Sequence, residues 1–146
     1  MFLVPWKFPI RVVLSRDVVL KVEFLDKAVE NFEKPEGGLA EKLCNDHVAY
    51  FSGERVEFDY KVSLKTEFMR RVLNEVRKVG YGETTTYGEI ARKLNTSPRA
   101  VGQALKANPA PVIIPCHRVL AKGGLGGFSQ GLNVKRELLR LEGVLV

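Results

Sequence analysis

The stretch that most constrains this chain runs from Asn108 to Arg118 and reads Asn-Pro-Ala-Pro-Val-Ile-Ile-Pro-Cys-His-Arg. Its three prolines exclude a helix, because proline lacks an amide donor and restricts the residue before it. The apolar residues 112–114 favour burial in an extended conformation. The sequence therefore predicts a rigid extended segment that holds Cys116 and His117 against the core.

The charge of the chain is unevenly distributed along its 146 residues. Residues 1–62 contain 9 Lys and Arg against 11 Asp and Glu, whereas residues 63–146 contain 14 against 6, so the two parts carry −2 and +8. The positive excess lies in the part that contains Cys116. A local positive field beside a reactive group is typical of proteins that act on a polyanion, and nucleic acid is the leading candidate. A basic surface that serves only solubility is the alternative.

Composition restricts the environment of the protein. Apolar residues make up 45% of the chain, which is enough to pack one domain or two small ones. Two prolines, a lysine and an arginine interrupt the first apolar run, so neither a signal-peptide core nor a membrane span is expected. We therefore expect a cytoplasmic protein without a membrane partner, in which Cys44 and Cys116 stay reduced.

Residues 1–62 have the pattern of a small sheet with one helix. Branched aliphatic residues dominate 9–14 and 18–25 on either side of a polar break, which predicts a β-hairpin. A helix is expected over 39–51, and alternating apolar residues predict a strand over 56–61. Cys44 and His47 form a Cys-x-x-His pair, but the only other cysteine and histidine are those proposed to react, so a packed thiol is favoured over a metal site.

The remaining residues predict helices. An apolar stripe marks a helix between 66 and 80. Thr86 and Glu89 have the spacing of a capping box, and a Ser-Pro pair opens a further helix over 98–107. Two short helices joined by a tight turn predict a helix-turn-helix, a motif found in DNA-binding proteins but also in helical hairpins that never meet DNA.

A glycine-rich segment and a last helix complete the chain. Five of the ten residues 122–131 are glycine, so this loop can bring its backbone close to a ligand, although the Gly-Lys-Ser/Thr ending of a phosphate-binding loop is absent. The last helix is expected from about Asn133 to Gly143. Glu142 falls in its final turn, where the helix dipole disfavours an anion. A solvated glutamate is one explanation of this mismatch, and a further role for the carboxylate is the other.

The segment Pro115-Cys116-His117-Arg118-Val119, with Asn108-Pro109 before it and the glycine-rich loop after it, resembles the active-site segment of the O6-alkylguanine-DNA alkyltransferases, the methylated-DNA-protein-cysteine methyltransferases. The resemblance spans about 68–143 and is more specific than an isolated cysteine. It implies an α/β chain with a small N-terminal ribonuclease-H-like sheet domain, residues 1–62, and a mainly helical C-terminal winged helix-turn-helix-like domain, residues 63–146.

The resemblance also implies roles for single residues. Glu142 would orient His117, and His117 would polarise a water that takes the thiol proton of Cys116. Tyr87 would donate a hydrogen bond or proton to the departing guanine, and Asn108 would brace the cysteine loop. A thiol of ordinary pKa is mostly protonated at neutral pH, so we expect surroundings that make Cys116 acidic.

DNA contacts are implied for the helix over 98–107, which would enter the minor groove with Arg99 in the space of a rotated guanine. The alternative is a helix packed by its alanines with solvated charges. The expected DNA-binding residues are Arg99, Tyr87, Lys106 and Lys122. The expected substrate-pocket residues are Ser129, Pro115 and Gly131.

The reaction implied is irreversible transfer of an alkyl group from O6 of guanine in double-stranded DNA to Cys116. It would need no cofactor and no metal, occur once per molecule, and be carried out by a monomer. Two alternatives remain open. One is a helix-turn-helix regulator that binds DNA without chemistry, and the other is a cysteine hydrolase that uses Cys116 and His117 and turns over repeatedly.

Overall fold

The N-terminal residues form the predicted hairpin and one strand that was not predicted. In the computed structural model, which describes all 146 residues, β2 (Ile10–Ser15) pairs antiparallel with β3 (Val18–Phe24). The two-residue turn between them places Arg16 at a φ of 55°. The additional strand is β1 (Phe2–Val4), which pairs antiparallel with β2 and forms one edge of the sheet.

The strand predicted over 56–61 is wrong in its extent. Only β4 (Lys61–Val62) is a strand, and it pairs in parallel with β3. The residues before it alternate in burial because Phe58 packs on the rings of His47 and Tyr50, at centroid distances of 4.8 and 5.7 Å. The alternating pattern therefore reflects contacts between this extended segment and an aromatic cluster. It does not reflect pairing with a neighbouring strand.

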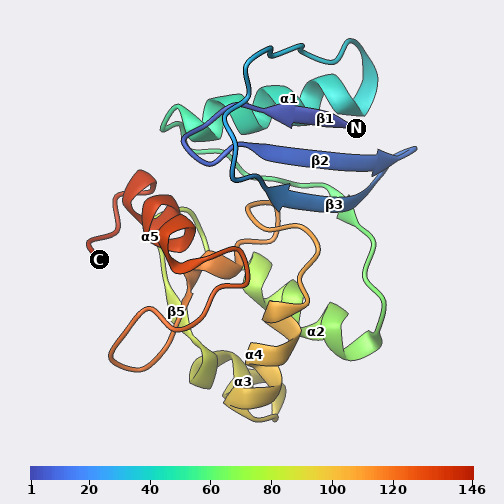
Figure 1. Cartoon of the computed structure of the whole chain (residues 1–146). Helices are drawn as coiled ribbons and strands as arrows, with labels where there is room; N and C mark the ends of the chain where they lie inside the picture. The colour runs from blue at the N-terminus through green and yellow to red at the C-terminus, as the bar shows by residue number, and fades with distance from the viewer.

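Helix α1 (Gly38–Phe51) confirms the helix predicted for the first part. Leu43 and Cys44 from this helix lie in one core cluster with apolar residues of β1, β2 and β3. Cys44 is fully buried, as expected for a packed thiol. The sheet and α1 occupy the upper part of Figure 1.

The predicted helices of the second part are also present. They are α2 (Glu67–Arg77), α3 (Tyr87–Leu94) and α4 (Pro98–Lys106), with the short strand β5 (Thr85–Thr86) before α3. Their starts follow the sequence signals, because the side chains of Thr66, Thr86 and Ser97 each accept a hydrogen bond from the amide three residues later. Asn95, at a φ of 55°, makes the tight turn between α3 and α4.

The segment that carries the cysteine is buried as predicted, but it is not extended. Val112 has a φ of 76°, and Ile114 N donates to Ala110 O at 2.9 Å. This turn is followed by the 3-10 helix η1 (Cys116–Arg118) and by β6 (Val119–Leu120), which pairs in parallel with β5. The prolines exclude an α-helix but are compatible with turns, so the chain folds back on itself at this point.

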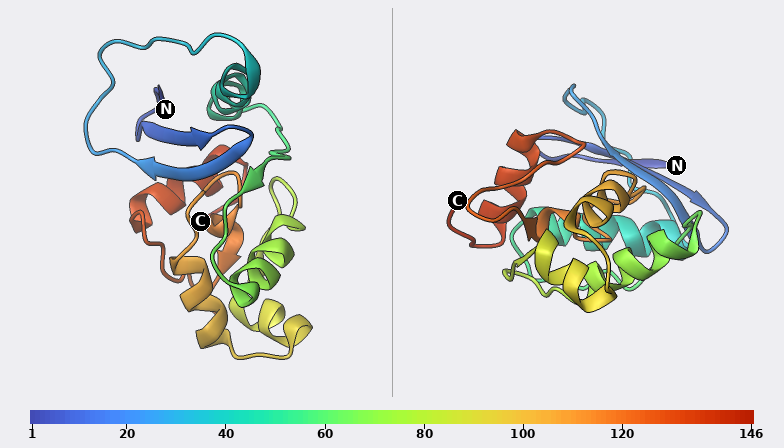
Figure 2. Two further views of the ribbon diagram at one scale, coloured as in Figure 1. Left: turned by 90° about the vertical axis from the view of Figure 1, so that its right-hand side faces the viewer. Right: turned by 90° about the horizontal axis from the view of Figure 1, so that it is seen from below.

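Helix α5 (Leu132–Leu141) is the last helix, as predicted, and it lies beside the sheet (Figure 2). The two parts share their cores. Ala110 and Ile113 join the cluster of the sheet, and Val134 and Leu138 of α5 pack with Tyr50 of α1. The division into domains at residue 62 stays a prediction. No helix combines the length and apolar character that a membrane crossing requires.

Candidate active site

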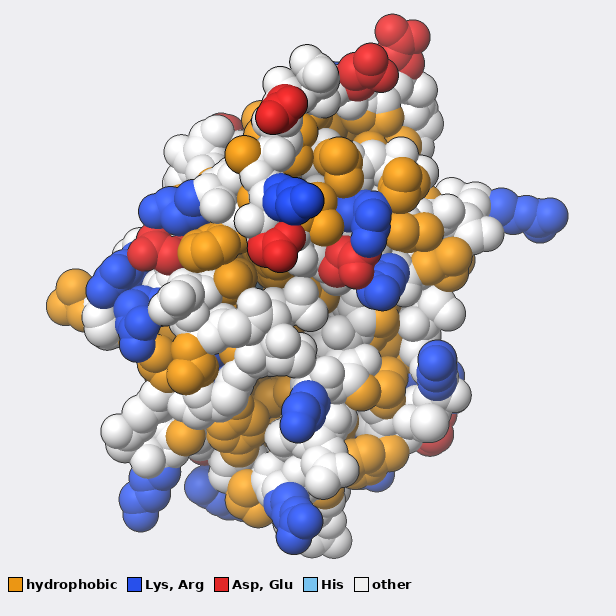
Figure 3. All heavy atoms as spheres, in the orientation of Figure 1, with side chains coloured by type: hydrophobic (Ala, Val, Ile, Leu, Met, Phe, Trp, Pro, Cys, Tyr) orange, Lys and Arg blue, Asp and Glu red, His pale blue; other side chains and the backbone are white.

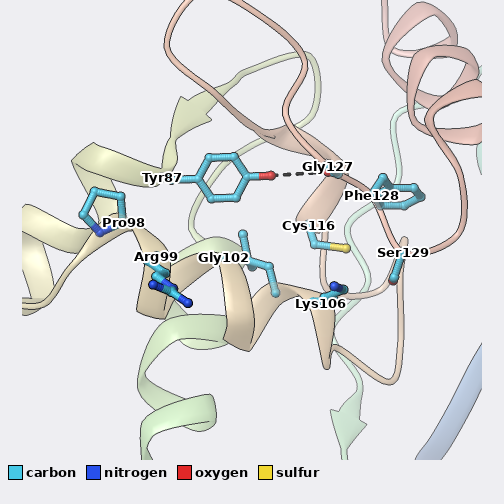
Figure 4. Close-up of a pocket in the computed structure, with 10 residues that line it drawn as sticks. Tyr87, Pro98, Arg99, Gly102, Lys106, Cys116, Gly127, Phe128 and Ser129 are labelled. Atoms are coloured by element: carbon cyan, nitrogen blue, oxygen red, sulfur yellow. Dashed lines mark hydrogen bonds between the residues drawn. The ribbon is translucent and has the colours of Figure 1, made fainter.

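Cys116 lies at the wall of a cavity of about 490 Å³. Figure 4 shows its sulfur directed toward the side of the cavity formed by Phe128 and Ser129 of the glycine-rich loop. This volume falls within the range typical of small-molecule pockets. The lining residues are Tyr87, Pro98, Arg99, Gly102, Leu105, Lys106, Cys116, Gly127, Phe128 and Ser129.

The surroundings of Cys116 do not make it acidic, and the expectation that they would is wrong. The residue is only 7% exposed, and burial raises the pKa of its thiol to about 11. The Asn108 amide, the Lys135 ammonium and nearby backbone amides lower the pKa, but they do not outweigh burial. The thiol is therefore protonated at rest, and a reaction at this sulfur needs a base that takes the proton.

His117 is the buried neighbour that can act as that base. Its Nε2 lies 2.6 Å from Oε2 of Glu142. Because an ionised carboxylate only accepts hydrogen bonds, Nε2 carries the hydrogen and Nδ1 carries the lone pair. Nδ1 is buried and has no partner in the protein. Burial lowers the pKa of His117 against the opposing effect of Glu142, so the ring is neutral and can accept a proton.

Glu142 is held by four residues from different parts of the chain. Arg118 donates from Nε to Oε1 at 2.8 Å and from Nη2 to Oε2 at 3.0 Å. The amide of Gly82 donates to Oε1 at 3.0 Å, and the hydroxyl of Tyr50 donates to Oε2 at 2.5 Å. Burial alone would raise the pKa of this carboxyl, but hydrogen bonds from His117, Arg118 and Tyr50 hold it well below its ordinary value. These donors explain how an anion is tolerated at the C-terminal end of α5.

Lys135 is a buried charged residue that the sequence reasoning missed. Its Nζ donates to Val119 O at 2.7 Å and to Gly127 O at 3.0 Å, and it lies 5.8 Å from the centre of the Tyr87 ring. Burial lowers its pKa to about 8, with an opposing effect from Cys116. The residue sits beside Val134 on the buried face of α5, and that position was the available signal.

Tyr87 and Asn108 are fixed by hydrogen bonds close to the cysteine. The Tyr87 hydroxyl donates to Gly127 O at 3.3 Å, which ties the start of α3 to the glycine-rich loop (Figure 4). The Asn108 side chain donates to Ile114 O and accepts from Ala110 N, both at 3.0 Å. Asn108 thereby closes the turn that precedes Cys116.

The other residues expected from the sequence fall into three groups. Arg99, Lys106 and Ser129 line the cavity together with Tyr87 and Cys116. His117, Glu142 and Asn108 are buried behind its wall. The residues that the structure does not bring to the cavity are Pro115, Lys122 and Gly131. The roles of all these residues stay predictions.

The mouth of the cavity is basic. Residues 87–106, which form α3 and α4, contain four Lys or Arg and one Glu. Arg99 and Lys106 are both exposed. Lys and Arg side chains predominate over the lower part of the face in Figure 3, whereas acidic side chains gather toward its top and middle. A basic rim around a cavity that is large enough for a nucleobase suits a nucleic acid.

Comparisons with known proteins show which family the chain is similar to. A family model described as "6-O-methylguanine DNA methyltransferase, DNA binding domain" matches residues 67–144. The methylated-DNA-protein-cysteine methyltransferase of Sulfolobus acidocaldarius is 48% identical over 127 residues, which cover 86% of this chain and 81% of that protein. That of Metallosphaera sedula is 46% identical over 142 residues, covering 94% and 88%.

A solved structure of Mycobacterium tuberculosis OGT in complex with DNA superposes with a TM-score of 0.82 and 35% identity, covering 96% of this chain and 90% of that chain. The expected α/β fold and the family resemblance are thereby confirmed. From its matching segment and its similarity over most of its length, the chain belongs to the 6-O-methylguanine DNA methyltransferase family.

Proposed function

We propose that this chain is a DNA repair protein that transfers a methyl or other alkyl group from O6 of guanine in double-stranded DNA to Sγ of Cys116, once per molecule. The observation that carries the proposal is the position of the sulfur. Sγ borders a cavity that is large enough for a nucleobase and has a basic mouth, while His117 and Glu142 are buried and do not line that cavity. This arrangement admits a nucleobase to the sulfur and keeps bulk water from the acid-base pair.

The chemical step follows from the protonation states. Nδ1 of His117 accepts the thiol proton, through one water as the family resemblance implies, and Glu142 stabilises the imidazolium that forms. The sulfur attacks the alkyl carbon as the bond from that carbon to O6 breaks. Guanine leaves with the bonding electrons and then takes up the proton, and the products are guanine and S-alkylcysteine. A thioether is a very poor leaving group, so the free thiol does not return.

Tyr87 and Lys135 are placed to assist the departing base. The Tyr87 ring lines the cavity, and burial raises the pKa of its hydroxyl, so this group stays a donor. We propose that it donates to guanine as negative charge develops there. Lys135 contributes positive charge behind the same wall, where it favours the thiolate of Cys116.

The alkyl carbon cannot be reached inside a duplex, so the nucleotide must rotate out of the helix at a cost of a few kcal/mol. We propose that α4 enters the minor groove and that Arg99 fills the vacated space, because Arg99 is exposed at the mouth of the cavity. Lys106 and Lys122 would contact phosphates. Ser129, Pro115 and Gly131 remain the proposed pocket residues, and of these only Ser129 lines the cavity.

We further propose that the protein is a monomer, that it acts in the cytoplasm, and that it needs neither a cofactor nor a metal. The two alternative functions explain less of the structure. A regulator without chemistry gives no role to a cysteine beside a base-sized cavity with a buried histidine-glutamate pair. A cysteine hydrolase would use the same groups, but it would release its product and continue.

Stoichiometry separates these functions. Duplex DNA with one O6-methylguanine is mixed with less than an equal amount of protein, and restored guanine is counted at completion. The proposal predicts a plateau equal to the amount of protein, and the Cys44→Ala variant should reach the same plateau. Product beyond one equivalent would indicate turnover, and no product would indicate binding alone, so either result would contradict the proposal.

A further inference from the structure

Tyr50 brings the N-terminal part of the chain into direct contact with the acid-base pair. It lies on α1, is fully buried, and donates from its hydroxyl to Oε2 of Glu142 at 2.5 Å. The same hydroxyl lies 3.4 Å from Nε2 of His117. Tyr50 and Glu142 are 92 residues apart in sequence, so the contact depends on how the two parts pack.

We propose that Tyr50 is a positioning residue for the proton transfer from Cys116 to His117. Its hydroxyl donates a hydrogen bond to Oε2 of Glu142. It thereby weakens the hydrogen bond that the same oxygen accepts from the His117 ring. The consequence for catalysis rests on the proposed function, whereas the coupling between the three side chains can be measured without it. Helix α1 is then part of the machinery of the site as well as of its scaffold.

Three donors compete for one oxygen of Glu142. Oε2 of Glu142 receives hydrogen bonds from His117 Nε2, Tyr50 OH and Arg118 Nη2, at 2.6, 2.5 and 3.0 Å. A carboxylate oxygen offers about two lone-pair directions, so three donors share its charge. When the Tyr50 donor is removed, more of that charge faces His117 and stabilises the imidazolium. His117 in a Tyr50→Phe variant therefore holds a proton more tightly than in the original chain.

The other charged groups around the ring stay in place in that variant. Arg118 and Lys135 disfavour a proton on His117, while Glu142 favours one. Tyr81 packs at 6.0 Å from the Tyr50 ring and donates from its hydroxyl to Leu141 O. The Cys116 thiol is protonated at rest and adds no charge. The expected change therefore comes from the missing hydroxyl.

A purely structural role makes a different prediction. The Tyr50 ring packs edge-on against Phe51, Phe58 and Tyr81. Tyr50→Phe keeps the ring and its packing, so a tyrosine that serves only the core would leave the protonation of His117 unchanged. Tyr60→Phe is a matched control, because Tyr60 also comes from the N-terminal part and its hydroxyl bonds Asp46, away from the site.

The direct test is an NMR titration of protein labelled with ¹⁵N-histidine. The chain has only two histidines, and His117→Gln assigns their signals. We expect Tyr50→Phe to raise the titration midpoint of His117 by roughly 0.5 to 1 pH unit, in line with the loss of one hydrogen bond to a charged group. Tyr60→Phe should leave it unchanged. A His117 midpoint that is not raised in Tyr50→Phe contradicts the inference.

The second measurement joins the inference to the reaction. Single-turnover rates on O6-methylguanine duplex are recorded against pH, and the acid limb for Tyr50→Phe should move upward by the same interval as the midpoint. Coincident acid limbs would overturn the positioning role. If the midpoint of His117 moves but neither protein transfers the methyl group, the proposed function fails while the coupling of Tyr50 to His117 stands.

Discussion

The Cα of Gly126 lies so close to the ring of Tyr87 that no side chain fits between them. A Cβ at Gly126 would be 2.8 Å from Cε2 of Tyr87 and 2.9 Å from its hydroxyl oxygen, and Gly126 has a φ of 75°. The glycine-rich loop thus has a specific requirement at this position. It lets the backbone lie directly on the tyrosine that forms one wall of the cavity.

Gly126→Ala should therefore displace Tyr87 and slow alkyl transfer by about tenfold or more, because small misplacements at a reacting centre are costly. Single-turnover rates on O6-methylguanine duplex measure the loss. Gly124→Ala is the matched control, since a Cβ there meets nothing within 4 Å and the rate should hardly change. Equal rates for the two variants would show that the position of Tyr87 does not matter.

Glu142→Gln should reduce both activity and stability. It removes the negative charge and one of the two acceptor oxygens that hold His117 and Arg118, so Arg118, which is 7% exposed, loses its counter-ion. We expect a rate loss of about 100-fold and a destabilisation of about 3 kcal/mol. Rates and urea unfolding check the two effects. Glu137→Gln is the control on the same helix. Glu137 is half-buried and pairs with Lys7 and Arg140 near the surface, so the rate should not change and the stability should change by less than about 1 kcal/mol. A Glu142→Gln protein with the original rate would exclude the proposed relay.

Arg99→Ala should weaken repair of duplex DNA more than reaction with a free alkylguanine base, because only the duplex requires the nucleotide to rotate out. A loss of about tenfold on the duplex corresponds to somewhat more than 1 kcal/mol of the rotation cost. Arg140→Ala removes the same charge away from the cavity and serves as the control. Equal losses on the two substrates would show that Arg99 has no part in extrusion.

His47 should make the fold sensitive to acid. It is fully buried, its Nε2 has no partner, and burial lowers its pKa to about 4. The folded-state pKa lies below the unfolded value of about 6.5, so the unfolded chain binds the proton more tightly and stability falls as the pH drops from 6.5 toward 4.

Over the whole pH range, protonation of His47 lowers the free energy of unfolding by about 3 kcal/mol. Urea unfolding between pH 7.5 and 4.5 should show a steeper loss of stability for the original chain than for His47→Gln. Both proteins retain His117, so that histidine affects both curves alike. Parallel curves would show that protonation of buried His47 does not contribute to the loss of stability in acid.

Local signals predicted the helices well. The helix starts at Thr86 and Ser97 are set by side chains that bond amides three residues later, and such contacts can be read from spacing alone. The turn at Val112 could not be read in this way. Its φ of 76° is unusual for a β-branched residue, and the turn is held by the buried side chain of Asn108.

The sequence reasoning named Cys116, His117 and Glu142, whose roles stay predictions, but it missed two buried residues that lie around them. Tyr50 and Lys135 were missed because their partners lie far away in sequence or are backbone carbonyls, which leave no motif. The acidity of Cys116 was predicted wrongly for a related reason. The sequence shows the charges near a cysteine, whereas the burial that raises its pKa appears only in the folded chain.

The central claim is that the sulfur of Cys116 becomes the permanent acceptor of the alkyl group. Intact-mass measurement after incubation with O6-methylguanine duplex tests it most directly. We predict one added methylene mass per chain, mapped to the peptide that contains Cys116, present in Cys44→Ala and absent in Cys116→Ala. An unchanged mass, or the same addition in Cys116→Ala, would contradict the account.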